Sequence, residues 1–203
     1  MLTTAPPPVG RHNPFATRFT RPGAVPPLDP LGLPLDVAGL ARRARCLGVS
    51  AIEGMHGAGK STLLAALAST LADSGLLAGR IRSRSRRDGP IVARAVFRTR
   101  PGTMLCVDGW ETLGVLQGAL VSRVARYRGV GLIVTVHRPG RMATLVHCTT
   151  SPALLGRIVA DLPDHGGLIA AEDVVDAYAA HGGNLREALY DLYDRFERRC
   201  RDR

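Results

Sequence analysis

The sequence predicts an α/β fold, an αβα sandwich built on a parallel sheet, with a small helical unit at its C-terminal end. Apolar runs that suit buried strands alternate with helical patterns up to about residue 150, which is typical of parallel sheets. From Ser151 onward every pattern is helical. With 203 residues, 45% of them apolar, the chain suits one domain with an appendage. We therefore expect three parts, at residues 1–35, 36–150 and 151–203.

The first part, residues 1–35, holds nine of the 14 prolines and predicts an arm with little regular structure. We expect residues 1–11 to be disordered and residues 13–34 to lie extended on the surface of the domain. Asp36 then N-caps a helix that continues to about Leu47.

The second part contains the predicted sheet. Four apolar runs predict buried strands, at residues 49–53, 104–108, 130–136 and 143–148. Helices are predicted at residues 61–71 and 111–127. Two segments are less regular: residues 80–86 favour an edge strand with a basic outer face, and residues 91–98 suit either a short helix or a second hairpin arm.

The third part is predicted to contain three helices, at residues 152–162, 171–180 and 184–201. Ser151 is the N-cap of the first of these helices, and Pro152 occupies its first turn. Leu185, Leu189 and Phe196 lie on one face of the last helix, which predicts an amphipathic helix packed on its neighbours. We expect this unit to form a lid beside the sheet.

A glycine-rich loop follows the first strand and precedes the next helix. It fits the pattern G-x-x-x-x-G-K-[ST], whose backbone N–H groups hold nucleotide phosphates. Its lysine is the only one among 27 basic residues, and a compact ammonium fits between β- and γ-phosphates where a planar guanidinium does not. The predicted nucleotide-binding residues are Gly54, Met55, His56, Gly57, Ala58, Gly59, Lys60, Ser61 and Thr62 of the loop, together with Thr135. The expected ligands are ATP and Mg²⁺.

Two acids follow the third apolar run. Asp108 ends that run, so its carboxylate is placed to hold Mg²⁺ opposite the hydroxyl of Ser61. Glu111 is the candidate for orienting or deprotonating water, although an acid in the first turn of a helix is also favoured by the helix dipole alone. At the end of the next strand, Thr135 or His137 is the candidate for sensing the γ-phosphate.

From residue 13 to residue 200 the order of elements resembles the AAA+ ATPases, in particular the clamp-loader and origin-recognition branches. Residues 183–189 look like the G-[DN]-x-R-x-A-[LIV] signature of the lid helix in that family, and the resemblance makes Arg186 the sensor that reaches the γ-phosphate. Arg141, and less well Arg138, matches an arginine that such proteins supply in trans to a neighbouring subunit. The alternative for Arg186 is a solvated helix charge paired with Asp191 or Glu187.

Two further features refine this resemblance. Asn13-Pro14-Phe15 is similar to an N-P-F segment of some bacterial AAA+ ATPases, in which the arm lies near the adenine. The spacing of Asp108 and Glu111 departs from the adjacent Asp-Glu of AAA+ proteins and looks more like the signal-transducing STAND NTPases. This departure affects the expected rate of hydrolysis, and nucleotide binding is expected either way.

The net charge of +10 indicates an acidic partner, such as nucleic acid, an anionic surface or an acidic protein, unless the arginines are simply solvated. None of the four cysteines forms a C-x-x-C pair, and no apolar run is long enough to span a membrane. Cys106 and Cys148 fall in predicted strands and are interpreted as reduced core residues. Together these features predict a cytoplasmic protein.

Three functions fit these features. The first is an ATP-driven switch of AAA+ type that acts on a protein or nucleic-acid partner, with self-assembly through Arg141. The second is a small-molecule or nucleotide kinase. The third is an adaptor that binds nucleotide without hydrolysis and docks nucleic acid through the arginines of residues 80–87.

Overall fold

A computed structural model describes residues 13–202 and confirms the predicted α/β class. Its centre is a five-stranded, all-parallel sheet in the order β2-β3-β4-β1-β5. The strands are β1 (Val49–Gly54), β2 (Leu77–Arg82), β3 (Met104–Asp108), β4 (Gly131–Val136) and β5 (Ala143–Cys148). Because the strands all run in one direction, their carboxyl ends meet along one edge of the sheet, which is where ligands bind in open α/β sheets.

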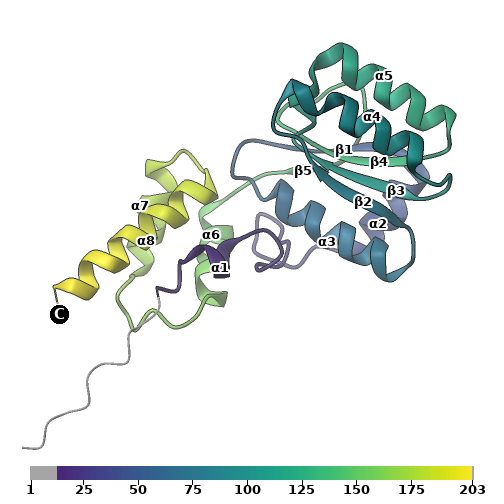
Figure 1. Ribbon diagram of the computed structural model, residues 1–203. Coiled ribbons are helices and arrows are strands. Elements are labelled where there is room, and N and C mark those ends of the chain that lie inside the picture. The colour runs from purple at the N-terminus through teal and green to yellow at the C-terminus, as the bar shows by residue number, and fades with distance from the viewer. Residues whose placement is uncertain (1–12, 203) are drawn as a thin grey trace, which may run out of the picture.

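Helices cover both faces of this sheet (Figure 1). α2 (Val37–Leu47) and α3 (Lys60–Asp73) pack on one face, while α4 (Gly89–Arg98) and α5 (Gly114–Tyr127) pack on the other. The first layer buries the leucines of α3 against Ile52 and Ile133, and the second buries valines of α4 and α5 against Val107 and Val134. The sheet therefore has a core on each side, which explains why β1 and β3 are buried along their whole length.

The remaining helices form a separate unit beside the sheet (Figure 1). They are α6 (Pro152–Asp161), α7 (Ala171–Ala180) and α8 (Leu185–Arg201). The hydroxyl of Ser151 accepts from the N–H of Leu154 at 3.0 Å, so the predicted N-cap is present. The apolar face predicted for the last helix is also buried, with Phe196 only 2% exposed.

The arm joins the two units. Apart from the short helix α1 (Thr17–Thr20) and two isolated bridges, residues 13–35 have little regular structure. The arm does not lie only on the surface, because Phe15 is 1% exposed and packs on Phe196 with ring centroids 6.3 Å apart. The side chain of Asn13 donates to the carbonyl of Tyr193 at 3.1 Å. The arm thus starts in the helical unit and then runs to α2 at the sheet (Figure 1). The disorder predicted for residues 1–11 lies outside the described residues.

The prediction that residues 143–148 form a buried strand is wrong. β5 is an edge strand and most of its residues are exposed or half-buried, Cys148 among them. Two polar side chains of β5 contact Glu53 on the neighbouring strand β1. The hydroxyl of Thr144 donates to the carboxylate of Glu53 at 2.8 Å, and the imidazole of His147 lies 3.7 Å from the same carboxylate.

Other boundaries differ by a few residues. The second edge strand, β2, is present, but it starts at Leu77 and ends at Arg82. Residues 91–98 belong to the helix α4, which decides between the two alternatives for that segment. The helix predicted at 111–127 begins as a 3-10 turn, η2 (Trp110–Leu113), and becomes α5 at Gly114, whose φ of 72° allows the change of direction.

Replacing Phe15 with alanine should lower the free energy of unfolding by about 3–5 kcal/mol, because the ring is fully buried between the arm and α8. Urea unfolding followed by circular dichroism measures this change. Leu33→Ala in the same arm is the control, since that side chain is 57% exposed and its loss should change stability by less than about 0.5 kcal/mol. Equal effects of the two substitutions would contradict the described anchoring.

Asp173 should make the helical unit sensitive to acid. Hydrogen bonds from the Arg199 guanidinium, above all, hold the pKa of Asp173 well below its usual value of 3.8, so this carboxylate stabilises the fold above about pH 4. That contribution is lost as the pH falls through the lowered pKa. We expect Asp173→Asn to cost about 2 kcal/mol at neutral pH and progressively less below pH ~4.

Urea unfolding at a series of pH values tests this expectation. Asp176→Asn in the same helix is the matched control, because its side chain is exposed. A difference between Asp173→Asn and the wild type that stays constant into strong acid would show that the ion pairs with Arg195 and Arg199 are not its source.

Candidate nucleotide-binding site

The glycine-rich loop connects the end of β1 to the start of α3, at the carboxyl edge of the sheet. Gly57 and Gly59 have φ values of 74° and 82°, a region that favours glycine. For the N–H groups of these two glycines, no acceptor is found among residues 13–202. They lie next to the N-terminus of α3, where the helix dipole adds partial positive charge. Within residues 13–202 the loop therefore presents two N–H groups without an acceptor, and their binding of an anion stays a prediction.

Lys60 lies at the base of this loop and is 7% exposed. Its ammonium donates to the carbonyl oxygens of Gly54 and Met55, at 2.6 Å each, and lies 3.1 Å from Nδ1 of His137. Burial lowers the pKa of Lys60, an effect that nearby Glu111 and Asp108 oppose. The ammonium is thus held by neutral oxygens beside the loop, where phosphate oxygens are stronger acceptors for it.

Asp108 is buried at the end of β3, and two hydroxyl groups donate to its Oδ1. Ser61 at the start of α3 does so at 3.0 Å, and Thr135 of β4 does so at 2.8 Å. The hydroxyl of Thr135 also accepts from the N–H of Gly109 at 2.8 Å, so this buried side chain holds Asp108 in place. Its role as a sensor of the γ-phosphate remains a prediction.

The pair formed by Ser61 and Asp108 fits a magnesium site. A hydroxyl and a carboxylate are hard oxygen ligands, and Mg²⁺ takes few protein ligands and completes its shell with water and phosphate. Within residues 13–202 there is no group of three or more His, Cys, Asp or Glu residues that could hold a metal ion without such help. The donor set is therefore suited to a metal that arrives with a nucleotide.

His137 links Lys60 to Glu111. Its Nε2 lies 2.6 Å from Oε1 of Glu111, and its ring lies against that of His56 with centroids 3.6 Å apart and the ring planes tilted by 33°. Burial lowers the pKa of His137, and the Lys60 and His56 charges act in the same direction, while Glu111 raises it. A neutral ring with its proton on Nε2 satisfies both contacts, because Nδ1 then accepts from Lys60 and Nε2 donates to Glu111.

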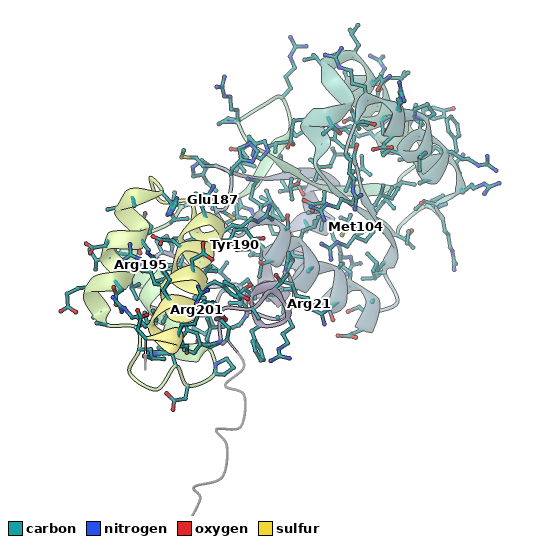
Figure 2. All side chains as sticks on the ribbon, turned by 60° about the vertical axis from the view of Figure 1, so that its left-hand side comes forward. Arg21, Met104, Glu187, Tyr190, Arg195 and Arg201 are labelled. Atoms are coloured by element: carbon teal, nitrogen blue, oxygen red, sulfur yellow. The ribbon has the colours of Figure 1, made fainter. Side chains whose placement is uncertain are left out.

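These residues line one large cavity of about 770 Å³ between the sheet, the arm and the helical unit. The loop, Asp108, Glu111 and Thr135 line the side formed by the sheet. The arm contributes residues from Thr17 to Pro30, and α8 contributes Arg186 and Tyr190. Figure 2 shows Tyr190 and Arg195 on different sides of α8, and only Tyr190 is on the cavity side. A cavity of this size accommodates a nucleotide.

Arg186 lies within electrostatic range of Lys60, whose pKa it lowers. Among the described residues no carboxylate lies within 4.0 Å of Arg186, and Asp191 instead pairs with Arg195 at 3.0 Å. The pairing with Asp191 or Glu187 is therefore absent, although Arg186 is exposed, as a solvated helix charge would be. Arg138 and Arg141 are exposed and outside the cavity, so the structure does not bring Arg141 to this site within one chain.

Two features in or beside the cavity go beyond the sequence prediction, which assigns Arg82 and Arg84 to nucleic-acid docking and Asn184 to the start of the last helix. Arg82 is the last residue of β2 and Arg84 follows it, and both lie in the cavity wall, so their position depends on where that strand ends. Asn184 N-caps α8 and also lies against the loop, because a Cβ built on Gly57 would lie 1.8 Å from its Oδ1. Asparagine is a common N-cap residue, so the sequence predicts the start of α8 at Asn184. The contact with Gly57 joins distant parts of the chain, and no local pattern predicts it.

Two of the solved structures to which the chain is similar illustrate the match. One is domain III of the replication initiation protein DnaA from Thermotoga maritima, with 12% identity, 79% of this chain and 89% of that chain covered, and a TM-score of 0.48. The other is PCH-2 from C. elegans, with 12% identity, 81% and 67% covered, and a TM-score of 0.42. No family model matches the sequence, and no curated protein does either. In the described part of the chain, no helix is long and apolar enough to cross a membrane.

The coupling of His137 to both charged neighbours can be measured. We expect its imidazole to titrate below the ordinary pKa, with Glu111→Gln lowering that pKa further and Lys60→Met raising it, because each substitution removes one of the opposing charges. Titration of the imidazole resonances by NMR gives the direction of both shifts. A rise on Glu111→Gln would show that the two side chains are not in contact.

Proposed function

We propose that the protein is a Mg²⁺-dependent P-loop ATPase of AAA+ type, acting as a nucleotide-driven switch on a protein or nucleic-acid partner. The observation that supports this best is the convergence of the free loop donors, Lys60 and the Ser61–Asp108 pair on one cavity that Arg186 also lines. The N–H groups of the loop and the ammonium of Lys60 suit the negative charge of a triphosphate. Adenine is the expected base. Mg²⁺, when bound, neutralises phosphate charge as the γ-phosphoryl group leaves.

In this proposal, different residues of the site have different roles in hydrolysis. Backbone N–H groups of the loop and the Lys60 ammonium hold the β- and γ-phosphates. Ser61 and Asp108 hold the metal or its water ligands. Glu111 orients the attacking water and accepts its proton, while His137 positions the carboxylate of Glu111 through their 2.6 Å contact.

The helical unit supplies the switch. Arg186 at the start of α8 contacts the γ-phosphate, so loss of that phosphate removes one attraction between the two walls of the cavity. Arg141, exposed outside its own cavity, reaches the γ-phosphate of a neighbouring copy in a homo-oligomer and neutralises charge that develops on it.

A second candidate is a nucleotide or small-molecule kinase. It is favoured by Arg82 and Arg84, two exposed guanidinium groups in the cavity wall that fit a second phosphate or an anionic acceptor. In that reaction the γ-phosphoryl group goes to the acceptor in place of water. A phosphorylated acceptor, with no free phosphate released, identifies this activity.

The proposal is tested by ATP affinity and phosphate release in the presence of Mg²⁺. Lys60→Ala should weaken ATP binding about 10-fold to 100-fold, because a charge-assisted hydrogen bond to phosphate is lost. Glu111→Gln should keep that affinity and lower turnover about 100-fold or more. Arg45→Ala on α2, exposed and away from the cavity, should leave both unchanged.

The outcomes separate the alternatives. Unchanged ATP affinity in Lys60→Ala refutes the nucleotide site itself. Tight ATP binding without any turnover, with or without DNA, indicates the adaptor in place of the ATPase. Mixing inactive Lys60→Ala with inactive Arg141→Ala should restore part of the turnover, because one active site then combines an intact loop with an intact Arg141 from the other copy.

A further inference from the structure

The outer face of α4 and α5 exposes an unusual number of large apolar side chains. Six of the twelve exposed large hydrophobic residues in the described part of the chain lie on these two helices. They are Ile91 (58% exposed), Phe97 (57%), Val115 (83%), Leu116 (86%), Leu120 (64%) and Tyr127 (92%). Single exposed apolar residues are common on proteins, but a group of this kind on neighbouring helices indicates a binding surface.

These six residues belong to one surface, which we call the α4–α5 face. The two helices lie side by side on the same layer of the sheet (Figure 1). Their first turns meet where Gly89 packs on Gln117, and their last turns meet where the guanidinium of Arg128, just after α5, lies 5.7 Å from the ring centroid of Phe97. On α5, positions 116, 120 and 127 follow helical spacing along one side.

The apolar residues are not needed to hold α5 on the sheet. That helix already buries Gly118, Val121 and Ala125 against the second core. Leu116, Leu120 and Tyr127 lie on its other side, so the helix is apolar on two faces. A helix that is apolar on both faces normally has a partner on each. Within residues 13–202 the elements that pack on α5 are α4, the turn η2 and the strands β1 and β4, and its outer side, with Leu116 and Leu120, is exposed.

The charges on this face have a single sign. α4 contains Arg94 and Arg98, α5 contains Arg123 and Arg126, and neither helix contains an acidic residue. All four arginines are exposed. Arg86 and Arg87 add positive charge before the start of α4, where the carboxylate of Asp88 accepts hydrogen bonds from the N–H groups of Arg84 and Ser85. The surface that covers this face must therefore offer apolar side chains together with negative charge.

We propose that the α4–α5 face docks an acidic, amphipathic segment of a partner protein. Apolar side chains of that segment pack on Leu116 and Leu120, and its carboxylates pair with the surrounding arginines. This inference does not depend on the proposed ATPase function, because it uses no residue of the cavity.

Other occupants fit the face less well. A second copy placed symmetrically would bring arginines against arginines, and the acidic helix α7 of another copy exposes only Val175 as a large apolar residue. A membrane surface requires apolar and charged side chains to separate into layers, whereas Arg123 lies within the apolar row of α5. Nucleic acid would use the arginines but would leave the aliphatic side chains exposed.

Selection from a displayed library of random peptides tests this proposal with the full chain. Peptides that bind the wild type and not Leu116→Asp/Leu120→Asp should be enriched in Asp and Glu, with apolar residues spaced i, i+3, i+4 and i+7. Their affinity should fall at least about 10-fold with Leu116→Asp/Leu120→Asp and also with Arg123→Glu/Arg126→Glu. Val175→Asp is the control that should change nothing, and thermal unfolding checks that each variant folds.

Four results would overturn the proposal. The first is enrichment of neutral or basic peptides, or no enrichment at all. The second is binding to phosphatidylserine vesicles that the Leu116→Asp/Leu120→Asp variant loses, which assigns the face to a membrane surface. The third is duplex DNA binding lost with Arg123→Glu/Arg126→Glu in the absence of peptide binding. The fourth is self-association in sedimentation that the same variants abolish, which assigns the face to a second copy.

Discussion

The buried carboxylate of Asp108 is the contact on which the candidate site depends. Its Oδ1 accepts from Ser61 on α3 and from Thr135 on β4, so a single oxygen joins three elements of the fold. A buried carboxylate is costly unless hydrogen bonds satisfy it, and here the bonds also set the distance between the glycine-rich loop and the end of β3. The parallel order of the strands is what brings these three groups to one edge.

Much of the fold follows from local sequence patterns. The strand at residues 104–108 and the helix at 171–180 have the predicted bounds, because an apolar run and an apolar helical face are each complete within the segment. β5 is the exception. Its sequence contains the apolar residues of a core strand, but its place at the edge depends on pairing with β1, and no short-range pattern specifies that pairing.

In the candidate site, too, the features that short-range sequence specifies are predicted and those that depend on long-range contacts are not. The roles of the loop and of Asp108 are predictions from short-range sequence, because the loop fits a phosphate-binding pattern and Asp108 ends an apolar run. The contact of His137 with Glu111 was not predicted, since it joins the end of β4 to the turn after β3, and the split of the 111–127 helix at Gly114 determines where Glu111 points. The proline-rich composition of the arm predicts a position on the surface, whereas one of its two phenylalanines, Phe15, decides where the arm is anchored.

The anchored arm has a mechanical consequence for the cavity. Residues 13–35 run from the core of the helical unit to α2 and line the cavity on the way, and the hydroxyl of Ser151 donates to the carbonyl of Pro30. The arm therefore acts as a second tether between the two walls, in addition to the chain that leads from β5 into α6. A rotation of the helical unit against the sheet would therefore have to move two chain segments at once, which restricts the directions available to it.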